Sequence, residues 1–196
     1  MTIGILGAGK LGCALARLFT AAGHDVVIAN RQGPPSLMRL EAELAPRLKA
    51  GTPAQASTAE AVILALPWRE LATTLPTLGP WTGRLVIDAT NPVMAPDAPI
   101  EPLGGRSSTQ VVSSMLPGAV VVKAFNTLPP QLLTRPDAGQ RVLFIAGDDE
   151  GGKKKVSALI ATLDFFPIDL GNSESGARLS QFPGGPLPGL NLLRFE

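Results

Sequence analysis

Short apolar runs alternate with helical patterns along most of the 196-residue chain. Runs rich in Val, Ile, Leu and Ala predict strands, and apolar residues spaced every three or four positions predict helices between them. The predicted strands cover residues 2–6, 26–29, 61–66, 84–88, 119–125, 141–146 and 166–169. The predicted helices cover residues 13–19, 37–48, 69–75, 107–115 and 150–163. This alternation predicts a doubly wound α/β domain, in which helices cover both faces of a mainly parallel sheet.

The most informative local pattern joins the first strand to the first helix. It reads Gly7-Ala8-Gly9-Lys10-Leu11-Gly12 and has the spacing G-x-G-x-x-G. The first glycine would allow a sharp turn, the second a close approach to a pyrophosphate, and the third close packing of the helix on the sheet. Free N–H groups at the helix N-terminus favour a phosphate anion. A glycine turn without a ligand is the alternative, but the flanking strand and helix favour a Rossmann-type dinucleotide site formed by these six residues.

The end of the second strand indicates which dinucleotide is bound. Asn30 and Arg31 stand where an NAD site would be expected to place an Asp or Glu against the ribose 2′-OH. No carboxylate is present to repel a 2′-phosphate, and the guanidinium of Arg31 matches phosphate geometry. Gln32, Gly33 and Ser36 offer further donors nearby. We therefore predict NADP(H), with Asn30, Arg31 and Ser36 among its ligands; the alternative is that Arg31 is an ordinary surface arginine.

The length of the chain fits one domain. We expect an NADP-binding Rossmann domain over residues 1–170 and a C-terminal tail over residues 171–196. Only 30 residues follow Phe166, and residues 183–189 are rich in Pro and Gly. A Pro-rich loop is expected over residues 93–103. Because the tail is short, we expect the substrate to bind on the dinucleotide domain, with the site or a dimer interface completed by the tail.

Ligands of an open α/β sheet bind outside the carboxyl ends of its strands. Leu66, Pro67 and Trp68 follow one predicted strand, and Asn91 follows the next. We expect these four residues to contact the dinucleotide, because an asparagine amide can bind a ring carbonyl or a carboxamide. Asn91 and Asn126 could instead shape turns, and packing in or beside the core is a slightly better explanation for Trp68.

Few ionisable side chains are placed for catalysis. Lys123 lies in an apolar strand, where it could bind a substrate anion or donate a proton, but a lysine that reaches the strand end or pairs with a carboxylate is the favoured explanation. His24 precedes the second strand, away from the carboxyl edge, and Cys13 has no histidine nearby in the sequence. The lysines at 153–155 are expected to form a solvated face. We predict no catalytic side chain and no metal site.

Composition narrows the possible partners. The chain has 17 basic and 16 acidic residues, so its formal charge of +1 gives no reason to expect nucleic acid or an anionic membrane surface. No apolar run is long enough to span a bilayer. The single cysteine and a strand that begins at residue 2, with no signal peptide expected, favour a cytoplasmic protein. We expect a small-molecule partner.

Five segments together resemble the F420-dependent NADP reductase family, which is itself related to the reductase domain of the STEAP metalloreductases. They are residues 7–12, 29–34, 65–68, 88–92 and 122–127. The resemblance implies that NADPH binds along the first two and that a deazaflavin (F420) or flavin ring lies near the last three. It also implies direct hydride transfer and a homodimer. The substrate-binding residues implied are Pro92, Ala124, Phe125, Asn126 and Thr127.

Three hypotheses follow. The first is an NADP(H)-dependent oxidoreductase that transfers a hydride directly between the nicotinamide and F420 or a flavin; such a transfer needs no ionisable side chain. The second is an NADP-dependent reductase of a small carbonyl, imine or quinone, with Lys123 as proton donor. The third is an NADP(H)-binding sensor without turnover.

Overall fold

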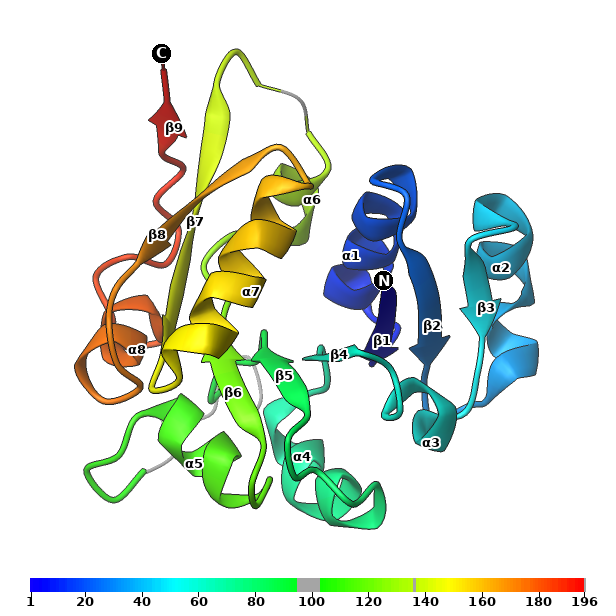
Figure 1. The fold of residues 1–196 in the computed structure, drawn as a ribbon, viewed down its shortest axis with the longest axis horizontal. Helices are drawn as coiled ribbons and strands as arrows, with labels where there is room; N and C mark the ends of the chain where they lie inside the picture. Colours follow the sequence, from blue (N-terminus) through cyan, green and yellow to red (C-terminus); the bar gives the residue numbers. More distant parts are fainter. Residues whose placement is uncertain (95–102, 136, 196) are drawn as a thin grey trace.

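The computed structural model describes residues 1–94, 103–135 and 137–195. A nine-stranded, mainly parallel sheet carries helices on both faces (Figure 1), which confirms the doubly wound α/β fold. The strand order is β3-β2-β1-β4-β5-β6-β7-β8, and β9 pairs with β7. The strands are β1 (Thr2–Leu6), β2 (Asp25–Ala29), β3 (Leu48–Ala50), β4 (Ala61–Leu64), β5 (Leu85–Asp88), β6 (Val120–Lys123), β7 (Gln140–Gly147), β8 (Phe165–Asp169) and β9 (Leu193–Arg194).

The helices are divided between the two faces of the sheet. They are α1 (Lys10–Ala21), α2 (Met38–Leu44), α3 (Pro53–Ala56), α4 (Trp68–Thr74), α5 (Ser108–Ser114), α6 (Pro130–Leu133), α7 (Glu150–Ala161) and α8 (Ser175–Ser180). One core cluster joins α1, α2, α6 and α7 to the sheet, and a second joins α3, α4 and α5 to the opposite face. Alternate strand residues serve the two clusters, so Ile63 packs in the first and Val62 in the second.

Strands β1 to β6 are all parallel. Their order reverses between β1 and β4, because the chain runs outward through β2 and β3 on one side and through β5 and β6 on the other. Ligands of such sheets bind at this reversal, outside the carboxyl ends of the strands. The loops that follow β1, β2, β4, β5 and β6 therefore define the edge at which to look for a site.

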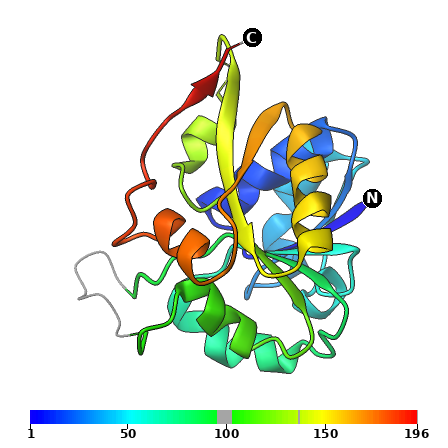
Figure 2. The ribbon, with the colours of Figure 1, turned by 60° about the vertical axis from the view of Figure 1, so that its left-hand side comes forward.

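The second part of the sheet brings the C-terminal tail to that edge. β7 is antiparallel to β6, β8 is parallel to β7, and β9 is antiparallel to β7. Between β8 and β9, helix α8 lies beside β7 and α5 (Figure 2). The tail then passes along β7 to reach β9, which pairs with the first two residues of β7.

The helix predicted over residues 37–48 is too long. α2 ends at Leu44, and Leu48 begins strand β3, a strand that the apolar pattern did not indicate. The cause is Pro46, because the residue before a proline is disfavoured in the helical region, and Ala45 is extended, with ψ of 149°. Leu48 is buried as a strand residue and not as the last position of a helical stripe.

The prediction of a solvated lysine face over residues 153–155 is wrong for Lys153. Its side chain is buried and forms ion pairs with Glu150 (2.7 Å) and Asp169 (3.0 Å), whereas Lys154 and Lys155 are exposed. These ion pairs raise the pKa of Lys153, mainly through the hydrogen bond with Glu150. Lys153 thus joins α7 to the end of β8.

Other elements differ in extent from the predictions. The strands predicted over 61–66 and 119–125 end at Leu64 and Lys123, so the residues that follow form loops at the carboxyl edge. Helices α3, α6 and α8 and strand β9 were not predicted. Most of the expected Pro-rich loop, residues 95–102, lies outside the described residues. In the described parts of the chain, no helix has the length and apolarity needed to cross a bilayer.

Candidate functional site

The loop between β1 and α1 requires glycine at two of its positions for different steric reasons. Gly7 has φ of +111°, and a Cβ there would lie 2.3 Å from the carbonyl oxygen of Ala65. A Cβ at Gly12 would lie 1.9 Å from the carbonyl oxygen of Gly7, so the helix can pack this closely only without a side chain. A Cβ at Gly9 would meet no protein atom within 4 Å. The protein itself does not require glycine at this position, but a ligand that approaches the backbone would.

Helix α1 begins without a side-chain cap at Gly9 and has no acidic residue in its first turn. Its first N–H groups therefore remain available to an anion, and the helix dipole adds to the attraction. The N-terminus of this twelve-residue helix borders a cleft of about 400 Å³.

The cleft crosses the carboxyl ends of β1, β2 and β4. It is lined by Gly7, Ala8, Gly9, Lys10, Leu11, Asn30, Arg31, Gln32, Ala65, Leu66, Pro67 and Glu70. Nine of these residues are among the predicted cofactor ligands, and the structure brings them together from three loops. Ala65 and Glu70 were not singled out from the sequence, because Ala65 was assigned to a strand and Glu70 lies in the first turn of α4.

The loop after β2 is held by its own polar side chains. The Asn30 Nδ2 donates to Ser36 Oγ at 3.0 Å, and Ser36 Oγ donates to the carbonyl oxygen of Gly33 at 2.7 Å. Arg31 is exposed and has no ion-pair partner among the described residues. No Asp or Glu occurs between residues 30 and 37. The loop therefore offers a free guanidinium and polar donors without a competing carboxylate.

Four predicted cofactor ligands lie beyond the lining of the cleft, namely Gly12, Ser36, Trp68 and Asn91. Trp68 is 7% exposed and packs in the core cluster between α4 and the sheet, in agreement with the packing alternative. Ser36 does not line the cleft, but its hydroxyl accepts a hydrogen bond from Asn30, which does.

Asn91 and Asn126 bind each other across the ends of β5 and β6. Asn126 Nδ2 donates to Asn91 Oδ1 at 3.0 Å, and Asn91 Nδ2 donates to the Asn126 carbonyl oxygen at 2.9 Å. Phe125, just before, has φ of +63°, a rare conformation for a residue with a side chain. The structure therefore brings the two predicted amides together, one strand beyond the cleft loop that follows β4.

The tail binds these same amides. Asn126 Nδ2 also donates to the Ser180 carbonyl oxygen at 2.6 Å, and the Phe182 N–H donates to Asn91 Oδ1 at 3.1 Å. The N–H of Gly189 donates to the Thr127 carbonyl oxygen at 2.8 Å. The end of α8 and the residues after it are thus fixed on the carboxyl edge.

The predicted substrate ligands lie at this edge, but their side chains are buried. Ala124 and Phe125 are 0% and 1% exposed and belong to the core. Pro92 and Thr127 are also buried, and Asn126 is 7% exposed. In this conformation, the surface of the edge is formed by the half-buried Asn91 and by the tail.

Lys123 is part of a buried polar network. Its side chain is fully buried, and its Nζ donates to Asp88 Oδ2 at 3.0 Å, to the Thr90 carbonyl oxygen and to Ser108 Oγ at 3.4 Å. Burial lowers the pKa of Lys123, although the charge and hydrogen bond of Asp88 act in the opposite direction. Pairing with a carboxylate, the favoured alternative, is therefore confirmed.

Both carboxylate oxygens of Asp88, the partner of Lys123, accept hydrogen bonds. Its Oδ1 accepts from the N–H and the hydroxyl of Thr90 at 3.0 and 2.7 Å, and its Oδ2 also accepts from Thr109 Oγ1 at 3.0 Å. The network joins the ends of β5 and β6 to the first turn of α5, and it includes Thr90, which directly precedes Asn91.

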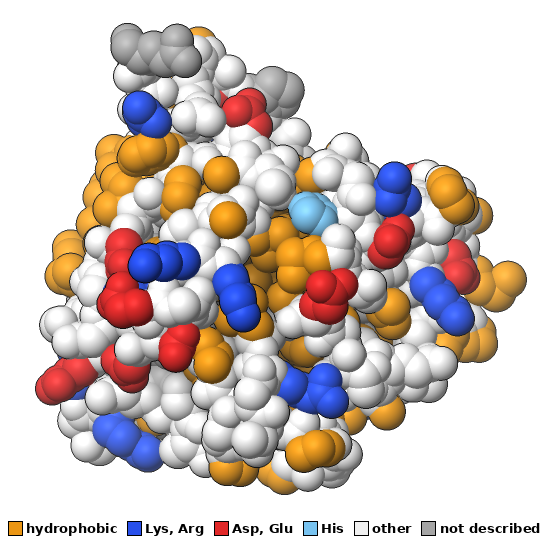
Figure 3. All heavy atoms as spheres, viewed as in Figure 1, with side chains coloured by type: hydrophobic (Ala, Val, Ile, Leu, Met, Phe, Trp, Pro, Cys, Tyr) orange, Lys and Arg blue, Asp and Glu red, His pale blue; other side chains and the backbone are white. Residues whose placement is uncertain are grey.

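His24 lies at the amino edge of β2, away from the cleft. Its Nε2 is 3.0 Å from Thr162 Oγ1, and this hydroxyl also donates to the Leu159 carbonyl oxygen at 2.6 Å. Burial is the main cause that lowers the pKa of His24. Figure 3 shows the histidine above an apolar hollow, which is lined by residues that include Leu85 and Leu159.

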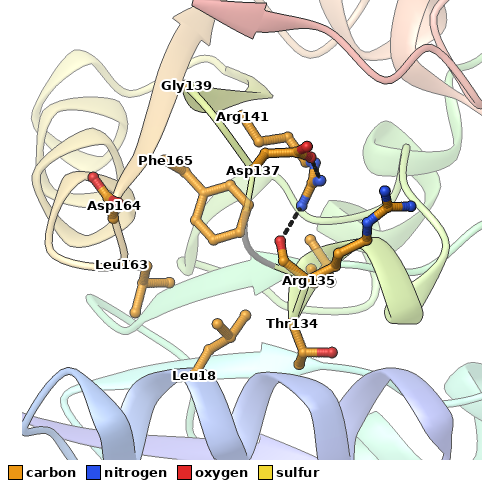
Figure 4. A pocket seen from close by; sticks show the side chains of 10 residues that line it. Leu18, Thr134, Arg135, Asp137, Gly139, Arg141, Leu163, Asp164 and Phe165 are labelled. Carbon is orange, nitrogen blue, oxygen red and sulfur yellow. Dashed lines mark hydrogen bonds and ion pairs between the residues drawn. The ribbon is translucent and has the colours of Figure 1, made fainter.

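A separate cavity of about 250 Å³ lies between α1, α6 and the starts of β7 and β8. Its polar wall is built around Arg141, which pairs with Asp137 and donates to the Arg135 carbonyl oxygen at 3.0 Å (Figure 4). Arg141 also donates to the Leu132 carbonyl oxygen and to Asn191 Oδ1 at 2.7 Å. Its guanidinium therefore joins α6, β7 and the tail and is not free to bind an anion.

The fold, the glycine loop and the acid-free loop after β2 define a class, the NADP-binding Rossmann oxidoreductases. Residues 2–92 match the family model described as "NADP oxidoreductase coenzyme F420-dependent". This match covers slightly less than half of the chain, and the resemblance inferred from the sequence is confirmed.

Solved structures and curated proteins give consistent relationships. A hypothetical protein from Sinorhizobium meliloti is 43% identical, with a TM-score of 0.93 over 100% of this chain and 97% of the other. A "putative f420 dependent nadp-reductase" from an Arthrobacter species is 26% identical, with a TM-score of 0.77 over 88% and 85% of the two chains. Metalloreductase STEAP3 of Rattus norvegicus is 30% identical over 95% of this chain. The chain spans 37% of the length of STEAP3.

Proposed function

We propose that this NADP-dependent oxidoreductase transfers a hydride directly between the nicotinamide and a deazaflavin- or flavin-type acceptor such as F420. The cleft fits NADP(H) on two counts. The position above Gly9 is open, as a pyrophosphate would require, and Arg31 is free to bind a 2′-phosphate. When bound, NADPH supplies the hydride, and water supplies the proton that completes the reduced acceptor.

The observation that carries the choice of acceptor is the state of Lys123. A carbonyl or imine needs a proton donor near the reacting carbon. Lys123 is 0% exposed, and its N–H groups are directed at Asp88, Thr90 and Ser108, so it is poorly placed for this role. A deazaflavin or flavin ring accepts the hydride without such a donor. We expect the Asn91 amide to contact the dinucleotide and the Asn126 amide to border the acceptor ring.

We also propose that the tail over residues 171–196 completes the site and contributes to a homodimer. Support for the first role comes from the hydrogen bonds of Ser180 and Phe182 with the two asparagines. Support for the second comes from exposed apolar side chains near β9, namely Leu190, Leu192 and Phe195. Sedimentation of the purified protein tests the dimer, and a monomer at micromolar concentration would contradict it.

The test of function is anaerobic oxidation of NADPH, measured by absorbance with F420, FMN, FAD or no acceptor. The proposal predicts turnover with at least one ring acceptor and slow oxidation without any. Turnover with a carbonyl, imine or quinone alone would favour the second hypothesis. NADPH binding without turnover on any acceptor would favour a sensor.

Arg31→Ala is expected to weaken NADPH binding by about 1–3 kcal/mol, roughly 5- to 150-fold, because a charge-assisted hydrogen bond to the 2′-phosphate is lost. NADH binding should change little. Titration of both nucleotides measures the difference. Arg39→Ala is the matched control, since Arg39 is also exposed but does not line the cleft. Equal losses for NADPH and NADH would contradict the assignment of Arg31.

A further inference from the structure

The large apolar side chain of Phe182 is exposed to solvent at the carboxyl edge of the sheet. Its side chain is 51% exposed, and its backbone N–H donates to Asn91 Oδ1 at 3.1 Å. Most phenylalanines of the described chain are instead buried or half-buried, and Phe195, at the far end of the tail, is the other exposed one. The position of Phe182 beside a predicted site residue distinguishes it from an isolated surface side chain.

The backbone on both sides of Phe182 is fixed. Gln181 Oε1 accepts from the N–H of Ser108 at 2.7 Å, which ties the tail to the start of α5. The N–H of Gly185 donates to the Gln181 carbonyl oxygen at 2.8 Å and closes a turn around Phe182 and the residues after it. The exposed ring is therefore presented by a positioned backbone and not by a freely moving chain end.

A ring acceptor needs a surface of this kind. Direct hydride transfer requires one face of the acceptor to lie on the nicotinamide, which leaves its other face to be covered by protein or water. An aromatic side chain covers a planar heteroaromatic ring through stacking or edge-to-face contact. Strands β4 and β5 are neighbours in the sheet, and Phe182 bonds to Asn91 in the loop that follows β5. Phe182 therefore lies one strand beyond the cleft loop that follows β4, on the side where the proposed function puts the acceptor.

We propose that Phe182 packs against the heteroaromatic ring of the electron acceptor and thereby selects for planar acceptors. This role rests on the proposed function and adds a substrate-binding residue to it. The buried Phe125, which the sequence implicated, contacts Phe19 inside the core and cannot offer its ring in this conformation.

The experiment compares Phe182→Ala, Phe182→Tyr and the control Met38→Ala in the full chain, since Met38 is also an exposed apolar side chain but lies outside the tail and the cleft lining. KM and kcat are measured for FMN and for F420 at saturating NADPH, and the affinity for NADPH is measured separately. Fluorescence quenching of FMN by the NADP⁺-saturated protein gives a readout that does not depend on turnover. Sedimentation of each variant shows whether the oligomeric state changes.

Phe182→Ala is expected to raise the acceptor KM and the FMN dissociation constant by about 10-fold, with NADPH affinity and sedimentation unchanged. Phe182→Tyr should restore most of the loss, and Met38→Ala should resemble the wild type. An unchanged acceptor KM in Phe182→Ala, with normal wild-type turnover, would overturn the role of Phe182 alone. A loss that accompanies a change in oligomeric state would also overturn it, in favour of a subunit contact. Absence of wild-type turnover and binding with every ring acceptor would overturn the proposed function and this role together.

Discussion

Asp88→Ala is expected to lower the free energy of unfolding by about 3–5 kcal/mol, one of the largest effects of a single substitution in this chain. The substitution leaves the ammonium of Lys123 buried and without its counter-charge. It also removes the acceptor of two Thr90 hydrogen bonds. Urea denaturation measures the change, and the melting temperature should fall by roughly 6–20 °C.

Lys123→Met tests the other member of this buried ion pair. Methionine fills a similar volume without a charge, and Asp88 keeps its hydrogen bonds from Thr90 and Thr109. We therefore expect a smaller loss of stability than for Asp88→Ala. In a double-mutant cycle with Asp88→Asn and Lys123→Met, the combined loss should be smaller than the sum of the single losses by about 1 kcal/mol or more.

The same variant separates the structural and catalytic roles of Lys123. If Lys123 only maintains the buried network with Asp88 and Thr90, the folded Lys123→Met protein should retain hydride transfer to a ring acceptor. Additive losses of stability would show that the pair is not coupled. Loss of turnover in a folded variant that still binds NADPH would contradict the assignment of a structural role.

Several features could be predicted from the sequence because their causes are local. The alternation of apolar runs and helical stripes is enough to predict a doubly wound sheet. The steric roles of Gly7 and Gly12 were predicted, since φ of +111° at Gly7 and close packing at Gly12 are needs that only glycine satisfies. The exposed Arg31 at the end of β2 followed from its place after a predicted strand.

The contacts of the tail could not be predicted, because they join residues far apart in the chain. Asn126 bonds to Ser180, 54 positions later, and Asn91 bonds to Phe182, 91 positions later. No local pattern encodes such pairs. Lys153 was misjudged for the same reason, since one of its partners is Asp169 on another element.

The burial of individual side chains at the carboxyl edge also could not be predicted from the sequence. A motif suggests that Phe125 lies near a ligand, but its φ of +63° directs the side chain into the core, against Phe19. Trp68 likewise follows a strand at the correct edge and yet packs under α4. The order of strands indicates which loops meet, whereas the conformation of each residue decides which side chains face the cleft.

Gly9→Ala and Gly12→Ala are expected to have opposite consequences, although only two residues separate them. A Cβ at Gly9 meets no protein atom, and its φ of −77° suits alanine, so stability should change by less than about 1 kcal/mol. NADPH binding should nevertheless weaken by about 10- to 100-fold, because the methyl group occupies the approach of the pyrophosphate.

A Cβ at Gly12 would lie 1.9 Å from the Gly7 carbonyl oxygen, so α1 or the loop must move. We expect a loss of about 3 kcal/mol or more in unfolding free energy, at or beyond the upper end for overpacked sites, with NADPH binding reduced as a consequence. Urea denaturation and NADPH titration of both variants separate the two effects. Wild-type NADPH affinity in Gly9→Ala would mean that the pyrophosphate does not approach this loop, and wild-type stability in Gly12→Ala would mean that helix and loop are less closely packed than the structure shows. The two glycines thus test independently whether the loop binds the dinucleotide and whether it supports the fold.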